Sequence, residues 1–162
     1  TSAAFHFHKI FFNDQNSIFL STGTTFVFGK FINHIENIKK NSNFYYLLPT
    51  NKRGAILSRR FHGGLLFDEL KKRKIKSINE ILAKKTIKEM NTYVKYNKNS
   101  DFKLIIDGPF AQNKDFLFSL KNYQKNITIY YAKNKNSPSL GMVYLCSMKK
   151  VKLLLTDYYE KI

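Results

Sequence analysis

The sequence predicts an α/β fold: a Rossmann-like three-layer domain with a mostly parallel sheet and a projecting basic helical hairpin. Short apolar runs rich in β-branched and aromatic residues alternate with amphipathic segments of helical period. Runs such as residues 45–48 are continuously apolar, as buried parallel strands are. A basic helical stretch interrupts this alternation. Because 162 residues suit one domain and no repeat or linker divides them, residues 1–162 form a single domain with the hairpin inserted at about 65–97.

Five segments are predicted to be strands because they are apolar, short and bounded by Asn, Ser, Thr, Gly or Pro. They are residues 18–20, 24–28, 44–48, 103–106 and 127–131.

Three further segments are predicted to be helices because their apolar residues recur at helical spacing. They are the segment with Phe31, Ile32, Ile35 and Ile38, the segment with Phe116, Leu117, Leu120 and Tyr123, and residues 151–159.

The basic stretch reads as two helices. Leu66 and Leu70 supply the apolar face of the first helix, which we expect to end near Lys76. The string 77–80, Ser-Ile-Asn-Glu, is a capping-box signature for the start of the second helix. More than half of the excess positive charge lies between Lys52 and Lys103. We therefore expect the anion-facing surface on this part of the molecule.

The composition indicates the kind of partner and excludes several classes of protein. The formal net charge is +17 and the pI about 9.9, which indicates a polyanionic partner. Hydrophobic residues make up 43% of the chain, which excludes a disordered basic tail. Cys146 is alone, so neither an internal disulfide nor a multi-cysteine zinc site is possible. We expect no membrane span, because no stretch approaches about 18 apolar residues.

The string 59–64, Arg-Arg-Phe-His-Gly-Gly, is the most informative one. It combines two guanidinium groups, an aromatic ring and a glycine pair that permits close approach to a phosphate. An ordinary loop with exposed arginines explains it equally well. No Walker-type loop or dinucleotide-binding fingerprint occurs in the sequence, so no cofactor is expected.

A second basic string follows at residues 71–74, with Lys76 beyond it. Such a run is usually a solvated helix face, but on a surface at +17 it favours contact with nucleic acid. The complete set of predicted RNA-binding residues is Lys52, Arg53, Arg59, Arg60, His62, Gly63, Gly64, Lys71, Lys72, Arg73, Lys74 and Lys76.

No catalytic or metal site is predicted. His6 and His8 would share one face of an extended segment, but zinc requires three or four ligands. Asp107 follows a predicted strand at the end where α/β sheets hold ligands, yet no second acid is suitably spaced for acid–base work. We therefore expect that the chain is not an enzyme and has no small-molecule substrate.

The chain resembles the small-subunit ribosomal protein S-two family. Residues 3–8, Ala-Ala-Phe-His-Phe-His, are similar to the family's His-Phe-Gly-His element, and residues 60–64 to its Arg-Trp-Leu-Gly-Gly. Residues 102–109 resemble its strand that ends in aspartate, and residues 127–138 its next strand and turn. Residues 148–162 match its terminal helix. The crossover helix that the family carries before the Arg-Gly-Gly string is too long for residues 51–59.

The resemblance implies a structural constituent of a small ribosomal subunit, with small-subunit rRNA and neighbouring small-subunit proteins as partners. An abundance of Phe, Ile, Lys, Asn and Tyr indicates an AT-rich gene, in either an organellar genome or an AT-biased nuclear one. Together with the resemblance, this leads us to expect an organellar ribosome, mitochondrial in the first instance, with a plastid or other organelle as the alternative. Because the chain begins at Thr1 instead of Met, we expect the natural N-terminus to be absent.

Two alternatives remain open. One is an α/β enzyme that processes nucleic acid, with Asp107 and a histidine at the strand ends. The other is a basic peripheral membrane protein that uses the partly amphipathic segment 78–94.

Overall fold

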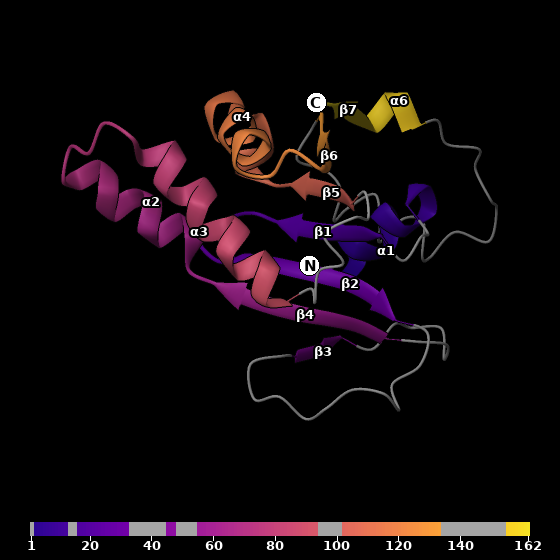
Figure 1. The fold of residues 1–162 in the computed structure, drawn as a ribbon. Coiled ribbons are helices and arrows are strands. Elements are labelled where there is room, and N and C mark those ends of the chain that lie inside the picture. Colours follow the sequence, from indigo (N-terminus) through magenta and orange to yellow (C-terminus); the bar gives the residue numbers. More distant parts are fainter. Residues whose placement is uncertain (1, 13–15, 33–44, 48–54, 94–101, 134–154) are drawn as a thin grey trace.

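The computed structural model describes residues 2–12, 16–32, 45–47, 55–93, 102–133 and 155–162. In this part of the chain one sheet forms the middle layer and helices cover both of its faces (Figure 1). The strands are β1 (Ser17–Ser21), β2 (Phe26–Ile32), β3 (Tyr45–Leu47), β4 (Ala55–Phe61), β5 (Phe102–Asp107), β6 (Ile127–Ala132) and β7 (Tyr159–Lys161). The helices are α1 (Ser2–Phe11), α2 (Gly63–Lys72), α3 (Ile78–Tyr93), the 3-10 turn η1 (Pro109–Gln112), α4 (Lys114–Tyr123) and α6 (Leu155–Tyr158).

The predicted three-layer α/β class is confirmed. The strand order is β3-β4-β2-β1-β5-β6-β7. The parallel arrangement that we expected holds in the core strands β1, β5 and β6, whereas β3, β4, β2 and β7 pair antiparallel to their neighbours. The sheet is therefore mixed. The physical reason is connection length: only residues 22–25 join β1 to β2, and such a short link permits only a hairpin.

Two helix predictions need correction. Phe31 and Ile32, expected in a helix, end β2, where they pair with Ile56 and Ala55 of β4; the rest of that segment lies outside the described residues. Of the predicted helices over 151–159 and 148–162, the part before residue 155 lies outside the described residues. Residues 155–158 form α6, whereas Tyr159 begins β7, which pairs with β6. In both places, pairing with a neighbouring strand overrides local helical periodicity.

Two further elements were not predicted. Residues 55–61 form β4, although the string with Arg59 and Arg60 was compatible with a loop. Since β3 and β4 are antiparallel, the chain needs no crossover helix between them. The N-terminal segment with His8 is the helix α1 and not an extended strand. Ala4 and His8 are buried there four residues apart, as one face of a helix requires, and the buried Phe12, directly after the helix, continues this spacing.

Alternate side chains of the central strands lie in two hydrophobic cores, one on each face of the sheet. Ile18 and Leu20 of β1 lie in the core beneath α3 and α4, and Phe19 between them lies in the core beneath α1 and α6. Buried side chains of α3, such as Leu82 and Met90, complete the first core. This packing fixes the position of α3 and α4 on the sheet.

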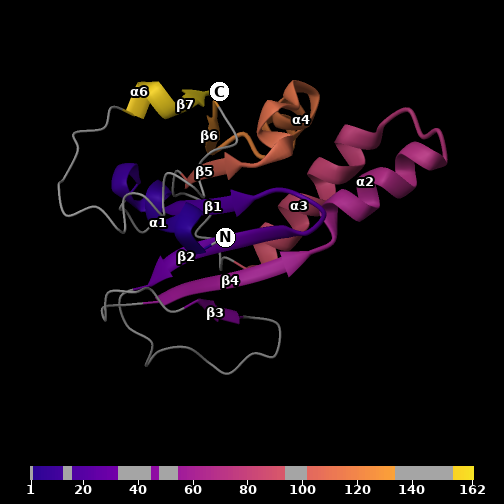
Figure 2. The same ribbon diagram turned by 180° about the vertical axis from the view of Figure 1, so that it is seen from behind.

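The predicted hairpin is present as α2 and α3, and it projects beyond the sheet (Figures 1 and 2). Helix α2 ends at Lys72, four residues before the expected end at Lys76, and α3 begins at Ile78, directly after the capping-box serine. The turn between them contains Lys74 at φ 55°, a left-handed conformation that commonly ends helices.

The start of α2 lies against the β1–β2 turn. A Cβ added to Gly64 would lie 2.3 Å from the carbonyl oxygen of Gly23 and 2.8 Å from Thr24 Cα. The amide of Gly64 donates to the Thr24 carbonyl at 3.1 Å. Only a residue without a side chain permits this approach, which sets where the hairpin leaves the sheet.

We predict that Gly64→Ala lowers the free energy of unfolding by about 1–3 kcal/mol, because backbone atoms must move to admit the methyl group. Gly23→Ala is the matched control. An added Cβ there has only Thr25 O nearby, at 3.9 Å, and should change stability by no more than about 0.5 kcal/mol. Urea unfolding measures both. Equal losses for the two variants would contradict the packing described.

Candidate nucleic-acid interface

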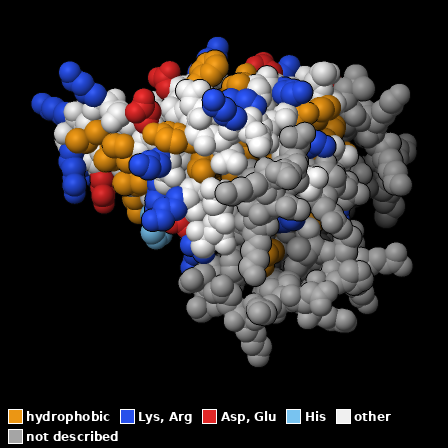
Figure 3. Space-filling model, viewed as in Figure 1, with side chains coloured by type: hydrophobic (Ala, Val, Ile, Leu, Met, Phe, Trp, Pro, Cys, Tyr) orange, Lys and Arg blue, Asp and Glu red, His pale blue; other side chains and the backbone are white. Residues whose placement is uncertain are grey.

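The turn of the hairpin carries an exposed basic cluster. We define this cluster as Lys71, Lys72, Arg73, Lys74 and Lys76, all of which are exposed. Figure 3 shows basic side chains gathered at the projecting end of the hairpin. The structure therefore brings together five of the residues that the sequence predicted to bind RNA.

Backbone geometry holds the cluster in place. The Arg73 amide donates to the Glu69 carbonyl at 3.1 Å and the Ile75 amide to the Leu70 carbonyl at 3.2 Å, which closes the end of α2. Lys71 and Lys72 lie in the last helical turn, where the negative end of the helix dipole favours cations. The cations thus lie on the last turn of α2 and on the short link to α3, where all five are exposed.

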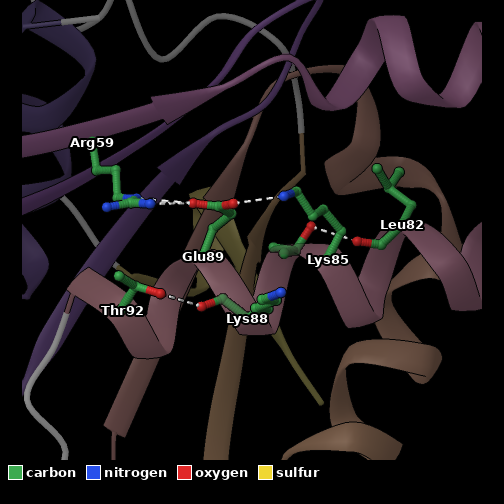
Figure 4. Close-up of polar contacts among 7 residues, drawn as sticks. Arg59, Leu82, Lys85, Lys88, Glu89 and Thr92 are labelled. Carbon is green, nitrogen blue, oxygen red and sulfur yellow. Dashed lines mark hydrogen bonds and ion pairs between the residues drawn. The ribbon is translucent and has the colours of Figure 1, made fainter. Parts of the chain in front are cut away.

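Arg59 has a different role. It is partly buried in β4, and its Nε and Nη2 atoms donate to Glu89 Oε2 of α3 at 2.9 and 2.7 Å (Figure 4). Lys85 Nζ lies 2.8 Å from Glu89 Oε1. Burial alone would raise the pKa of the Glu89 carboxyl, but hydrogen bonds from Lys85 and Arg59 outweigh it and hold that pKa below its usual value. Arg59 therefore links β4 to α3 through an ion pair within the protein.

The remaining predicted residues divide into three groups. Arg60 and His62 are exposed, and His62 Nδ1 lies 3.3 Å from Thr25 Oγ1. Gly63 and Gly64 are buried, so the close approach that we assigned to a phosphate is made by the protein itself, through Phe26 and the β1–β2 turn. Lys52 and Arg53 lie outside the described residues.

A cavity of about 370 Å³ lies at the base of the hairpin. It opens between α2, the β1–β2 turn and η1, beside the carboxyl ends of the parallel strands β1 and β5. Its walls are formed by Gly23, Thr24, Gly64, Phe67, Asp68, Pro109, Phe110 and Asn113. Sequence reasoning missed this cavity because its walls come from three separate segments.

A buried polar group lies on the opposite face of the sheet. His8 and Asp107 are 1% and 3% exposed, and His8 Nε2 lies 3.5 Å from Asp107 Oδ2. His8 Nδ1 is hydrogen bonded to the Tyr159 hydroxyl. Burial and the nearby Asp107 carboxyl group raise the pKa of that hydroxyl above its usual value. The group joins α1, β5 and β7 inside the protein.

Among the described residues, no group of three or more His, Cys, Asp or Glu side chains could hold a metal ion. No described helix is sufficiently long and apolar to cross a bilayer. The apolar face of α3, which a peripheral membrane protein would insert, is already buried in the core through Leu82, Ala83, Ile87 and Met90.

The fold has matches among solved structures. A carbohydrate kinase from Novosphingobium aromaticivorans matches with a TM-score of 0.68 and 15% identity over 89% of this chain. A xylulose kinase and a gluconate kinase from Lactobacillus acidophilus each match with a TM-score of 0.68 and 12% identity, also over 89% of this chain. This chain spans 43%, 40% and 40% of those three chains. No protein-family model and no curated protein matches it.

These matches contradict our expectation that the chain is not an enzyme, because all three structures are of kinases. The expectation rested on the absence of sequence motifs, and the fold of a kinase can be present without a motif that sequence reasoning recognises. At 12–15% identity the likeness shows the fold alone.

We predict that Glu89→Gln destabilises the fold by roughly 1–3 kcal/mol at pH 7, because it removes charged hydrogen bonds to partly buried Arg59. The folded-state pKa of Glu89 is lowered, so the ionised carboxylate stabilises the fold above about pH 4.5, and this contribution is lost as the pH falls through the folded value. The difference between wild type and variant should therefore shrink on acidification.

Urea unfolding between pH 7 and pH 3 measures this difference. Glu69→Gln, which alters an exposed acid on α2, is the control and should change stability little. A difference for Glu89→Gln that is constant across this range would contradict the assigned ion pair.

Proposed function

We propose that this chain is a constituent of the small subunit of an organellar, mitochondrial ribosome, where it binds small-subunit rRNA. The observation that carries the proposal is the basic cluster, five exposed cations on the projecting turn of a hairpin in a chain of net charge +17. The resemblance of residues 60–64 and the other quoted strings to the small-subunit ribosomal family supports the choice of RNA.

The physics of RNA binding fits this arrangement. Ammonium groups held next to one another repel until phosphates neutralise them, and binding then releases the counterions condensed on the RNA. A projecting hairpin can contact such phosphates while the rest of the domain stays outside the RNA. Exposed Arg60 and His62, at the base of the hairpin, extend the same surface toward the sheet.

We predict that replacing Lys71, Lys72, Arg73 and Lys74 together by Gln weakens binding to a small-subunit rRNA transcript by at least about tenfold and lowers the slope of log K against log salt by about 3. Filter binding between 50 and 300 mM KCl measures both quantities.

The matched control removes four exposed lysines elsewhere, Lys114, Lys125, Lys133 and Lys161. It has the same net charge as the hairpin variant. If the slope of log K against log salt falls by the same amount in both variants, binding depends on overall charge and the basic cluster is not the interface. If wild type does not bind the transcript, the proposed function itself is wrong.

A second candidate is transfer of a phosphoryl group to a sugar. The fold match to carbohydrate kinases favours it, although the chain spans less than half of each of them. Incubation with ATP, Mg²⁺ and xylulose or gluconate, with ADP as the measured product, tests it. Sugar-dependent ADP formation would support this candidate, and the absence of any ADP above the ATP-only control would exclude it for these two sugars.

A further inference from the structure

We propose that the cavity at the base of the hairpin holds an unpaired guanine base of the bound RNA. The inference rests on the proposed function, since it requires RNA on the hairpin, and it specifies which part of the RNA the protein recognises. The cavity, at about 370 Å³, lies near the lower end of the roughly 300–1,000 Å³ that small-ligand pockets span. It therefore suits a single base better than a helix or a protein segment.

Two partly buried aromatic side chains line the cavity. Phe67 of α2 and Phe110 of η1 both line it, and their ring centroids lie 5.1 Å apart with the planes at 86°. Both rings are only partly buried. Because unpaired RNA bases stack on aromatic side chains, this wall favours a base over a sugar or a lone phosphate.

The charge of the cavity opposes phosphate. Among the described residues that line it, Asp68 is the only charged one, and it is exposed. An ionised carboxylate only accepts hydrogen bonds, so it repels a phosphate and selects a group with donors. Guanine offers two adjacent donors, N1–H and the 2-amino group, which match the two oxygens of one carboxylate.

Several amides at the helix N-termini beside the cavity already have protein partners, which weakens the case for an anion there. The amides of Gly64 and Leu65 both donate to the Thr24 carbonyl, at 3.1 and 3.4 Å. At the start of α4, Asn113 Oδ1 accepts from the Phe116 amide at 3.0 Å. These amides have protein partners instead of a phosphate.

The sequence of α2 places cations directly beyond this carboxylate. Lys71 and Lys72 follow Asp68 by three and four residues, which is one helical turn toward the tip of the hairpin. One strand of RNA can therefore set its base against Asp68 and the aromatic wall while its flanking phosphates meet the basic cluster.

The test compares binding of wild-type protein to three RNA stems of the same length by fluorescence anisotropy. One stem is fully paired, one has a single bulged guanosine, and one has a bulged inosine, which lacks the 2-amino group. We expect the bulged guanosine stem to bind about tenfold more tightly than the other two. Equal affinity for all three stems would overturn the inference while leaving the proposed function standing.

Asp68→Asn should change the affinities for the paired stem and for the bulged guanosine stem in opposite directions. Removing a negative charge should strengthen binding to the paired stem but weaken binding to the bulged guanosine stem, because the second acceptor is lost. Asp115→Asn, which alters an exposed acid outside the cavity, should strengthen binding to both stems. If Asp68→Asn behaves like Asp115→Asn, the inference is wrong. If no stem binds to wild-type protein, the failure is that of the proposed function.

Discussion

The direction of the helical hairpin depends on one close contact, between Gly64 and the β1–β2 turn. No side chain fits between them, since a Cβ at Gly64 would lie 2.3 Å from the Gly23 carbonyl oxygen. This contact fixes the start of α2 at the carboxyl end of β1, and the Arg59–Glu89 pair fixes α3 against β4. Together they hold the basic cluster away from the sheet and leave the cavity open beneath it.

Charge then determines what the hairpin can do. Within the body of the domain some cations have protein partners: Arg59 and Lys85 share the carboxylate of Glu89, and Lys121 donates to the Ile127 carbonyl. The cluster at the hairpin turn lies outside this arrangement and is exposed. Like charges at such spacing destabilise the free protein, and this repulsion supports the polyanionic partner that we propose. The kinase likeness describes the same fold and leaves this surface charge to be explained separately.

The pattern of apolar residues along the sequence predicted those strands and helices that depend mainly on local interactions. The strands around Ile18 and Ile105, the helix with Phe116 and Leu120, and the basic hairpin all follow from apolar periodicity. Distant contacts decided the rest. Strand β4 accommodates the partly buried Arg59 because Glu89, thirty residues further along, pairs with it. Phe31 joined a strand through pairing with Ile56, and His8 meets Asp107 only through the folded sheet. The cavity likewise exists only once three segments meet, so no single motif could have indicated it.

We propose that the exposed cations of the hairpin lie on ribosomal RNA. The decisive experiment is ultraviolet crosslinking of the chain within isolated mitochondrial ribosomes, followed by mapping of the crosslinked peptides and nucleotides. We expect the chain to sediment with the small subunit in moderate salt and peptides spanning residues 59–76 to carry small-subunit rRNA nucleotides. Recovery of the chain as a free protein, or crosslinks confined to the opposite, α1 face of the sheet, would contradict it.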